Sequence, residues 1–191
     1  MSKILSLLIL IGIIGIIGGI GLMIGRTQLS EVEVNAQNQM PPQNSADETA
    51  IRFVVDEIDN AVDAKDWAKA RTFFSDRVNT DFTSLAGGKP AQITADELVG
   101  GWRTNLYADK KSFHLRGNHR IQINGKRAEA FSKAYAFNLL EKGKVTGLWE
   151  IWGNYTHTLE RTKDGWKVSG MTLNVIHKRG DDNVRTFVPE K

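Results

Sequence analysis

The chain has 191 residues, of which 41% are hydrophobic and 25% are charged, a composition that supports one ordinary globular core. Its 25 basic residues nearly balance its 22 acidic residues, giving a formal charge of +3, and no basic run is longer than a pair, so we expect no nucleic-acid partner. The absence of cysteine excludes disulfides, thiolate nucleophiles and cysteine-ligated zinc.

The first 25 residues predict a membrane anchor. Residues 4–24 form an apolar run of 21 residues, which as a helix would span about 31 Å, the thickness of the hydrocarbon core of a bilayer. Lys3 precedes the run and Glu31 and Glu33 follow it, so we expect a single-pass protein with its domain on the exported side of the membrane. The alternative is a cleaved signal peptide, which would leave the domain secreted or periplasmic.

A linker and one domain are expected after the anchor. Residues 26–46 are polar and contain Pro41 and Pro42, which is typical of a linker. The folded domain is expected over residues 47–178, and residues 179–191 are expected to form a peripheral tail.

Three helices are predicted in the first half of the domain. Apolar residues recur at helical spacing from Ile51 to Val62, behind a cap at Ser45 or Asp47. Asp66 is placed to cap a second, short helix. The segment 94–97 (Thr-Ala-Asp-Glu) is a capping box for a third. A short strand is expected over residues 77–82, between the second and third helices.

Beyond Asp109 the apolar period changes from 3.6 to 2, which predicts strands over residues 113–123, 127–140, 148–161 and 166–177. Asn124-Gly125 predicts a hairpin turn between the first two. The expected fold class is therefore α+β, with three helices packed on a curved antiparallel sheet. One face of the strand 127–140 carries only small or polar side chains, which predicts a pocket for a small apolar molecule. These residues are Ala130, Ser132, Ala134, Ala136 and Asn138.

Three segments resemble a known family. They are VDAKDW (62–67), FHLRGN (113–118) and DGWKV (164–168). Their order and spacing over about residues 48–178 resemble the SnoaL-like branch of the NTF2-like superfamily, which is similar to scytalone dehydratase and to hexachlorocyclohexane dehydrochlorinase. The resemblance implies a cone-shaped α+β barrel with an internal pocket, and a homodimer formed through the outer face of the sheet.

For the lyases of this family the resemblance implies an aspartate–histidine pair, and the matching positions here are Asp63 and His114. Imidazole is a suitable base for taking a proton beside a leaving hydroxyl or halide, and a carboxylate on its other nitrogen orients it. Strand alternation places His114 on the face of Arg116 and Asn118. The alternatives are that Asp63 merely ends a helix, with Lys65 or Arg71 as a partner, and that His114 is buried and satisfied by a backbone carbonyl.

Further pocket residues come partly from the same resemblance. Val62 and Phe82 match two tyrosines of scytalone dehydratase and Asn138 matches its second histidine, so scytalone-type dehydration is in doubt. Arg161 falls near an arginine that assists halide departure, with a surface ion pair to Glu160 or Asp164 as its alternative. Trp149 and Trp152 lie on opposite faces of one predicted strand, so one of the two can reach the pocket. We assign to substrate binding Val62, Phe82, Trp102, Asn138, Trp152 and Arg161.

Two functions remain open. The first is a membrane-tethered lyase, of dehydratase or dehydrohalogenase type, or an isomerase, which needs no cofactor. The second is a non-catalytic ligand-binding or protein-interaction module. The four histidines occupy separate places and show no metal-ligand spacing, so no metal site is expected.

Overall fold

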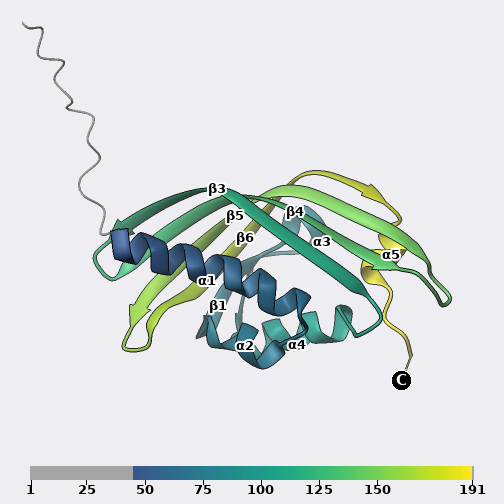
Figure 1. Ribbon diagram of the computed structural model, residues 1–191, viewed down its shortest axis with the longest axis horizontal. Coiled ribbons are helices and arrows are strands. Elements are labelled where there is room, and N and C mark those ends of the chain that lie inside the picture. Colours follow the sequence, from purple (N-terminus) through teal and green to yellow (C-terminus); the bar gives the residue numbers. More distant parts are fainter. Residues whose placement is uncertain (1–44, 191) are drawn as a thin grey trace, which may run out of the picture. The chain divides into compact units, whose positions relative to one another are not determined.

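The computed structural model describes residues 45–190, which form an α+β fold (Figure 1). A six-stranded sheet has the order β2-β1-β6-β5-β4-β3, with β1 and β6 parallel and every other pair antiparallel. The predicted curved sheet with helices on it is confirmed, but the expectation that the sheet is wholly antiparallel is wrong, because β1 pairs with β6 in parallel. In chain order the elements are α1 (Ser45–Asp63), α2 (Trp67–Thr72), β1 (Phe74–Asp81), α3 (Thr83–Ala86), β2 (Ala91–Thr94), α4 (Ala95–Asn105), β3 (Lys111–Asn124), β4 (Arg127–Leu140), β5 (Gly147–Thr162), β6 (Gly165–Gly180) and α5 (Asp182–Thr186).

The predicted anchor at residues 4–24 lies outside the described residues, as does the predicted linker except for its last two residues, which belong to α1. Within residues 45–190 no helix is long and apolar enough to cross a membrane.

Helix α1 lies across the sheet and supplies much of its packing (Figure 1). Its apolar stripe is buried as the periodicity predicts, with Ile51 and Val55 fully inaccessible. The helix ends at Asp63, and Asp66 then caps α2 by accepting a hydrogen bond from the backbone N–H of Lys69 at 3.0 Å. The turn between α1 and α2 therefore fixes the direction of the last turn of α1, where Asp63 lies.

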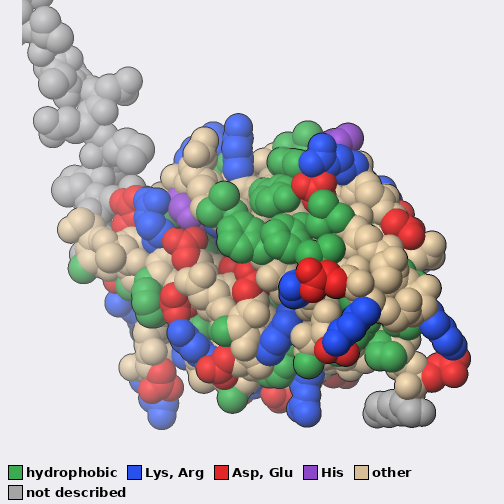
Figure 2. Space-filling view, turned by 45° about the vertical axis from the view of Figure 1, so that its right-hand side comes forward, with side chains coloured by type: hydrophobic (Ala, Val, Ile, Leu, Met, Phe, Trp, Pro, Cys, Tyr) green, Lys and Arg blue, Asp and Glu red, His purple; other side chains and the backbone are tan. Residues whose placement is uncertain are grey.

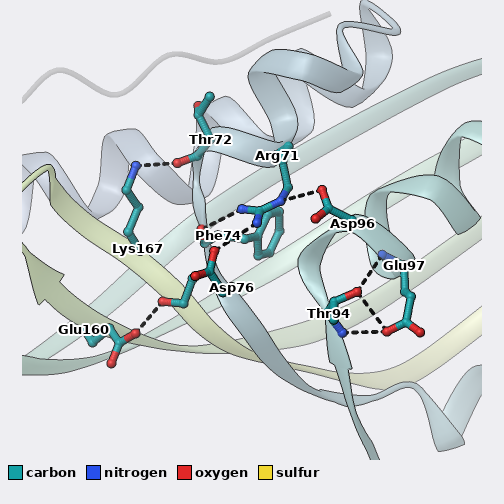
Figure 3. Close-up of polar contacts among 10 residues, drawn as sticks. Arg71, Thr72, Phe74, Asp76, Thr94, Asp96, Glu97, Glu160 and Lys167 are labelled. Atoms are coloured by element: carbon teal, nitrogen blue, oxygen red, sulfur yellow. Dashed lines mark hydrogen bonds and ion pairs between the residues drawn. The ribbon is translucent and has the colours of Figure 1, made fainter.

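Side-chain hydrogen bonds tie α2, β1 and α4 together (Figure 3). Arg71 donates to Asp96 on α4 at 2.9 Å and to Asp76 on β1 at 3.1 Å. The predicted capping box is confirmed, since the backbone N–H of Glu97 donates to the Thr94 hydroxyl and the backbone N–H of Thr94 donates to the Glu97 carboxylate. Neither α3 nor β2 was predicted, because four residues are too short to show a period.

The long strands follow the predicted alternation except at register shifts, which occur in β3 and between β5 and β6. All four predicted strands are present, and Gly125 adopts the left-handed φ of +57° that the hairpin turn requires. In β3 the register with β4 shifts between Gly117 and Arg120, and Asn118 has a φ of +52°. The expectation that Asn118 shares the face of His114 is therefore wrong, because this bulge leaves Asn118 exposed and turns His119 inward.

The C-terminal residues are part of the packed structure, in contrast to the peripheral tail expected over residues 179–191. Val184 of α5 is fully buried against the end of the sheet. Lys110, itself fully buried, donates from Nζ to the backbone carbonyls of Arg185 at 3.1 Å and Phe187 at 2.8 Å. Burial, with Arg185 and Lys65 nearby, lowers the pKa of Lys110 to about 8. The segment is mostly polar, so the sequence did not indicate that Val184 and Phe187 pack against the sheet.

Candidate active site

A cavity of about 230 Å³ lies on the inner side of the sheet. One buried cluster, beneath α1, includes Ala128, Ala130 and Leu159. A second, around α5, includes Leu140 and Trp149. Residues of both clusters line the cavity, together with residues that lie between the clusters. Its lining residues are Ile58, Asp59, Val62, Leu85, Trp102, Asn105, Leu106, His114, Arg116, Ala134, Tyr135, Ala136, Asn138, Trp149, Ile151, Gly153, Tyr155, Met171, Leu173 and Arg185.

Strand pairing explains why this region is hollow. In one row across the sheet, His114 pairs with Ala136 and Ala136 with Ile151. In the next row, Arg116 pairs with Ala134 and Ala134 with Gly153. The two central positions of these rows carry only a methyl group, and one outer position carries only a hydrogen atom. The inner side of the sheet therefore has little side-chain volume between His114 and Ile151.

Gly153 is required by the strand itself. The register between β5 and β6 shifts at this residue. A Cβ atom here would lie 2.7 Å from the backbone oxygen of Asn174 and 3.0 Å from Leu173. No larger residue fits this position without moving β6.

Asp63 and His114 form a hydrogen-bonded pair, of which His114 lines the cavity and Asp63 does not. Asp63 Oδ1 lies 2.7 Å from His114 Nδ1, and Asp63 Oδ2 accepts the backbone N–H of His114 at 2.7 Å. The Ser112 hydroxyl donates to Asp63 Oδ1 at 2.9 Å. Each of the two side chains is 21% exposed. Three contacts fix the carboxylate, and the carboxylate holds Nδ1, so Nε2 is the ring nitrogen available to a ligand.

The carboxylate of Asp63 is stabilised as an anion. Burial alone would raise its pKa, but the hydrogen bond and charge of His114 and the hydrogen bond from Ser112 bring the pKa below its usual value. An ionised aspartate favours the tautomer of His114 that carries its proton on Nδ1. Of the expected alternative partners of Asp63, Arg71 binds Asp76 and Asp96 instead. Lys65 donates to Ser112 at 2.7 Å, and its charge interacts with that of Asp63.

Three of the six residues assigned to substrate binding line the cavity, namely Val62, Trp102 and Asn138. The other three do not. Phe82 packs against the two buried clusters. Arg161 forms an ion pair with Asp47 and lies over the ring of Trp166, 4.7 Å from its centroid.

Trp152 lies on the outer face of the sheet, because the alternation in β5 turns Trp149 inward instead. Its ring contacts those of Tyr135, at a centroid distance of 5.1 Å, and His177, at 5.4 Å. Hydrophobic side chains gather in a patch on one face of the molecule (Figure 2). Phe113 and Leu115 of β3 are exposed hydrophobic side chains. The alternation was predicted correctly, but the wrong tryptophan of the two was assigned to the pocket.

A second charged pair at the cavity wall, the ion pair between Asp59 and Arg116, was not predicted from the sequence. Arg116 donates from Nε and Nη2 to the two carboxylate oxygens of Asp59, at 2.5 and 2.8 Å. Asp59 precedes Asp63 by four residues on one helix face, and Arg116 follows His114 by two residues on one strand face. These two spacings together would have predicted that both pairs form side by side. Leu85 and Arg185 were also missed, since they lie on the short elements α3 and α5.

The comparisons with known proteins agree with this fold. A family model described as a SnoaL-like domain matches residues 43–172. The structure is similar to that of the Kfla4162 protein from Kribbella flavida, with a TM-score of 0.70 and 22% identity, covering 75% of this chain and 99% of that chain. No curated protein matches the sequence.

Two further solved structures share the fold. One is a protein from Novosphingobium aromaticivorans proposed to be a scytalone dehydratase, with a TM-score of 0.60 and 16% identity over 71% of this chain and 88% of that one. The other is a hexachlorocyclohexane dehydrochlorinase, with a TM-score of 0.59 and 15% identity over the same shares of the two chains. The family match confirms the expected resemblance to the SnoaL-like family, and the solved structures share its fold.

Proposed function

The chain belongs to the SnoaL-like domain family, and from that premise we propose that it is a cofactor-independent lyase or isomerase acting on a small, largely apolar molecule. The cavity of about 230 Å³ is the substrate site. A cavity of about 150 Å³ accepts benzene, so this one suits a molecule of one or two rings.

In this proposal His114 is the general base and Asp63 is its positioning residue. Nε2 of His114 takes a proton from a carbon of the substrate, while Asp63 holds Nδ1 and stabilises the imidazolium that forms. Elimination of a neighbouring hydroxyl or halide would make the enzyme a lyase, and return of the proton to another carbon would make it an isomerase.

The observation that carries the proposal is the 2.7 Å contact between Asp63 Oδ1 and His114 Nδ1 at the wall of an apolar cavity. Here the carboxylate has three contacts that fix it, whereas only one nitrogen of the imidazole is held. This is the arrangement that proton abstraction requires.

The test is turnover of small cyclic compounds that carry a hydroxyl or a halide beside an acidic C–H, with mass spectrometry to detect loss of water or acid or a shifted double bond. The full-length protein should convert at least one of these compounds. His114→Gln should lower the rate about 10²–10⁴-fold, the usual contribution of a general base. Asp63→Asn should also lower it, because an amide favours the wrong tautomer of His114.

The control variant is His177→Gln, which changes a histidine on the outer face of the sheet, against Trp152. It should keep the wild-type rate. Ligand binding without turnover of any compound would contradict the enzyme and favour the non-catalytic binding module instead.

We also propose that residues 4–24 anchor the protein in a membrane with the domain on the exported side. Their apolar length and the flanking charges support this. Alkaline carbonate extraction should leave the full chain in the membrane fraction, and external protease should digest the domain in spheroplasts. Release of a shortened chain would indicate a cleaved signal instead.

The outer face of the sheet is proposed to join two copies of the chain. Phe113 is 43% exposed and stacks on Phe137, and Leu115 beside it is 58% exposed, so a second copy would bury apolar area here. Leu115→Lys should shift the species seen by analytical ultracentrifugation from dimer to monomer, whereas Phe53→Lys, an exposed apolar position on α1, should not.

A further inference from the structure

One charged side chain of the cavity wall has no part in the proposed proton transfer. Arg116 is 3% exposed, and two of its three guanidinium nitrogens bind Asp59. The third, Nη1, is buried and has no hydrogen-bond partner among residues 45–190. Buried donors in native proteins nearly always have an acceptor, so an unpaired one on a cavity wall indicates an acceptor that a ligand or a water supplies.

The place of Arg116 is defined by the strand. It follows His114 by two residues, so the two side chains enter the cavity about 7 Å apart along β3. Ala136 and Ala134 lie opposite them on β4 and leave the space between them open. A ligand held at Arg116 therefore extends along Ala134 and Ala136 toward Nε2 of His114.

The orientation of the guanidinium group is fixed on two sides. The ion pair with Asp59 holds one edge, and Arg116 Cζ lies 4.0 Å from the centroid of the Tyr155 ring. Since the group is held before any ligand enters, little conformational entropy is lost when an acceptor reaches Nη1.

The charges around Arg116 favour an uncharged acceptor. Asp59 already neutralises the guanidinium, and the carboxylate of Asp56 also acts on it. A carboxylate of the ligand placed at Nη1 would be close to both aspartates and would be repelled. A carbonyl oxygen accepts a hydrogen bond without adding a charge.

We propose that Arg116 is a substrate-binding residue whose Nη1 binds the carbonyl oxygen of an uncharged ketone of one or two rings. This inference rests on the proposed function, because it places the C–H beside that carbonyl at His114. When Nε2 of His114 takes this proton, the C–H electron pair forms a C=C bond and the carbonyl π pair moves to the oxygen. Arg116 then keeps its hydrogen bond to the enolate oxygen, whose charge is offset by the imidazolium of His114 that forms in the same step, and return of a proton from His114 restores the ketone.

The experiment measures the binding of three probes of similar size to the full-length protein in lipid nanodiscs, with empty nanodiscs as the blank. The probes are 1-tetralone (a ketone), tetralin (its hydrocarbon) and 1,2,3,4-tetrahydro-1-naphthoate (a carboxylate). The ketone should bind about 10- to 100-fold more tightly than the hydrocarbon, which is the range for a hydrogen bond to a charged group. The carboxylate should bind more weakly than the ketone.

The informative variant replaces both partners, Asp59→Leu together with Arg116→Met, so that no buried charge is left unpaired. It should bind tetralin as the wild type does and lose the preference for the ketone. The matched control, Glu150→Leu with Arg179→Met, removes an ion pair on the outer face of the sheet and should keep the preference. If the double variant at the cavity does not fold, Arg116→Lys decides, because it keeps the charge beside Asp59 and should still lose the preference.

Equal affinity of the wild type for ketone and hydrocarbon would overturn the proposal and leave a buried water as the partner of Nη1. Tighter binding of the carboxylate, or no binding of any probe, would overturn it as well. Exchange of the 1-tetralone protons beside the carbonyl for deuterium in D₂O separates the two proposals. A ketone preference without exchange supports Arg116 and contradicts His114 as a base, whereas exchange without the preference contradicts Arg116 alone.

Discussion

Two regions on the inner side of the sheet carry the same kind of small side chains but differ in how they are packed. The inward residues of β4 are small from Ala128 to Ala136, but Ala128 and Ala130 are buried in the cluster beneath α1, whereas Ala134 and Ala136 line the cavity. We name these regions the packed half and the hollow half. Small side chains on a strand therefore predict a cavity only where no helix fills the space above them.

The helix α1 makes the difference between the halves. Its first turns place Ile51 and Val55 in the same cluster as Ala128 and Ala130, with no exposed surface on either side chain. Its last turns line the cavity with Ile58, Asp59 and Val62. The apolar side chains of α1 therefore fill the packed half, whereas its Asp59 carboxylate faces the hollow half.

The largest expected effect is in the packed half. Ile51→Ala should lower the free energy of unfolding by about 2–5 kcal/mol, because it leaves a new void in a fully buried cluster. Ile151→Ala, the matched change at the cavity wall, should cost less, because it enlarges a space that already exists. Urea unfolding of the two variants measures both values, and equal losses would contradict the distinction between the halves.

Enlarging the alanines of β4 should have opposite consequences in the two halves. Ala130→Leu should destabilise the protein by about 1–3 kcal/mol through overpacking. Ala136→Leu should cost little stability and abolish binding of 1-tetralone, because its side chain would fill the cavity beside His114. Thermal unfolding together with calorimetric titration tests the pair. Intact binding by Ala136→Leu would place the ligand elsewhere.

Acid should weaken the packed half first. His157 is fully buried, and burial, together with the charges of Arg116 and His119, keeps its pKa well below 6.5. Below pH 6.5 the unfolded chain therefore binds a proton that the folded chain does not. The free energy of unfolding should fall with pH, by at most about 1.4 kcal/mol per pH unit for this one group.

The variant His157→Leu should reduce that slope between pH 6.5 and pH 5. Part of the slope should remain, because burial also lowers the pKa of His119 below its usual value. A slope unchanged by the substitution would show that His157 is not the group that titrates.

The smallest expected effect on stability is in the hollow half, and it lies at lower pH. The folded pKa of Asp63 is below its model-peptide value of 3.8, because hydrogen bonds from His114 and Ser112 outweigh the effect of burial. Its contribution to stability is complete above pH 3.8 and is lost as the pH falls through the folded pKa. Asp63→Asn should lower the free energy of unfolding above pH 5 by a constant amount and remove the slope that Asp63 causes below pH 3.8, which urea unfolding at several pH values can measure.

Local patterns in the sequence account for most of the fold. Caps and apolar periods located α1, α2, α4 and the four long strands, because these signals depend on neighbouring residues alone. The position of α5 depends on Val184 finding a place beneath the end of the sheet, which no local pattern encodes. The bulge at Asn118 could not be predicted for the same reason, because a register shift can be identified only when the partner strand is known.

The candidate site was predicted less completely than the fold. The positions of Asp63 and His114 followed from the family resemblance, and strand alternation correctly placed His114 and Arg116 on one face. Phe82 and Arg161 were assigned to the pocket by an ungapped comparison with relatives. Such a comparison does not show which way a side chain points in this fold. Asp59 was overlooked because its importance depends on Arg116, a partner 57 residues away.

The most direct test of a ligand site in the hollow half is a titration of the methyl-labelled full-length protein with 1-tetralone, followed by NMR. The methyl signals of Ala134, Ala136 and Ile151 should shift with a common dissociation constant, while those of Ala128 and Ala130 stay in place. Shifts confined to Ala128 and Ala130, or no saturable shift at any of the five, would contradict the assignment of the cavity beside His114 as the substrate site.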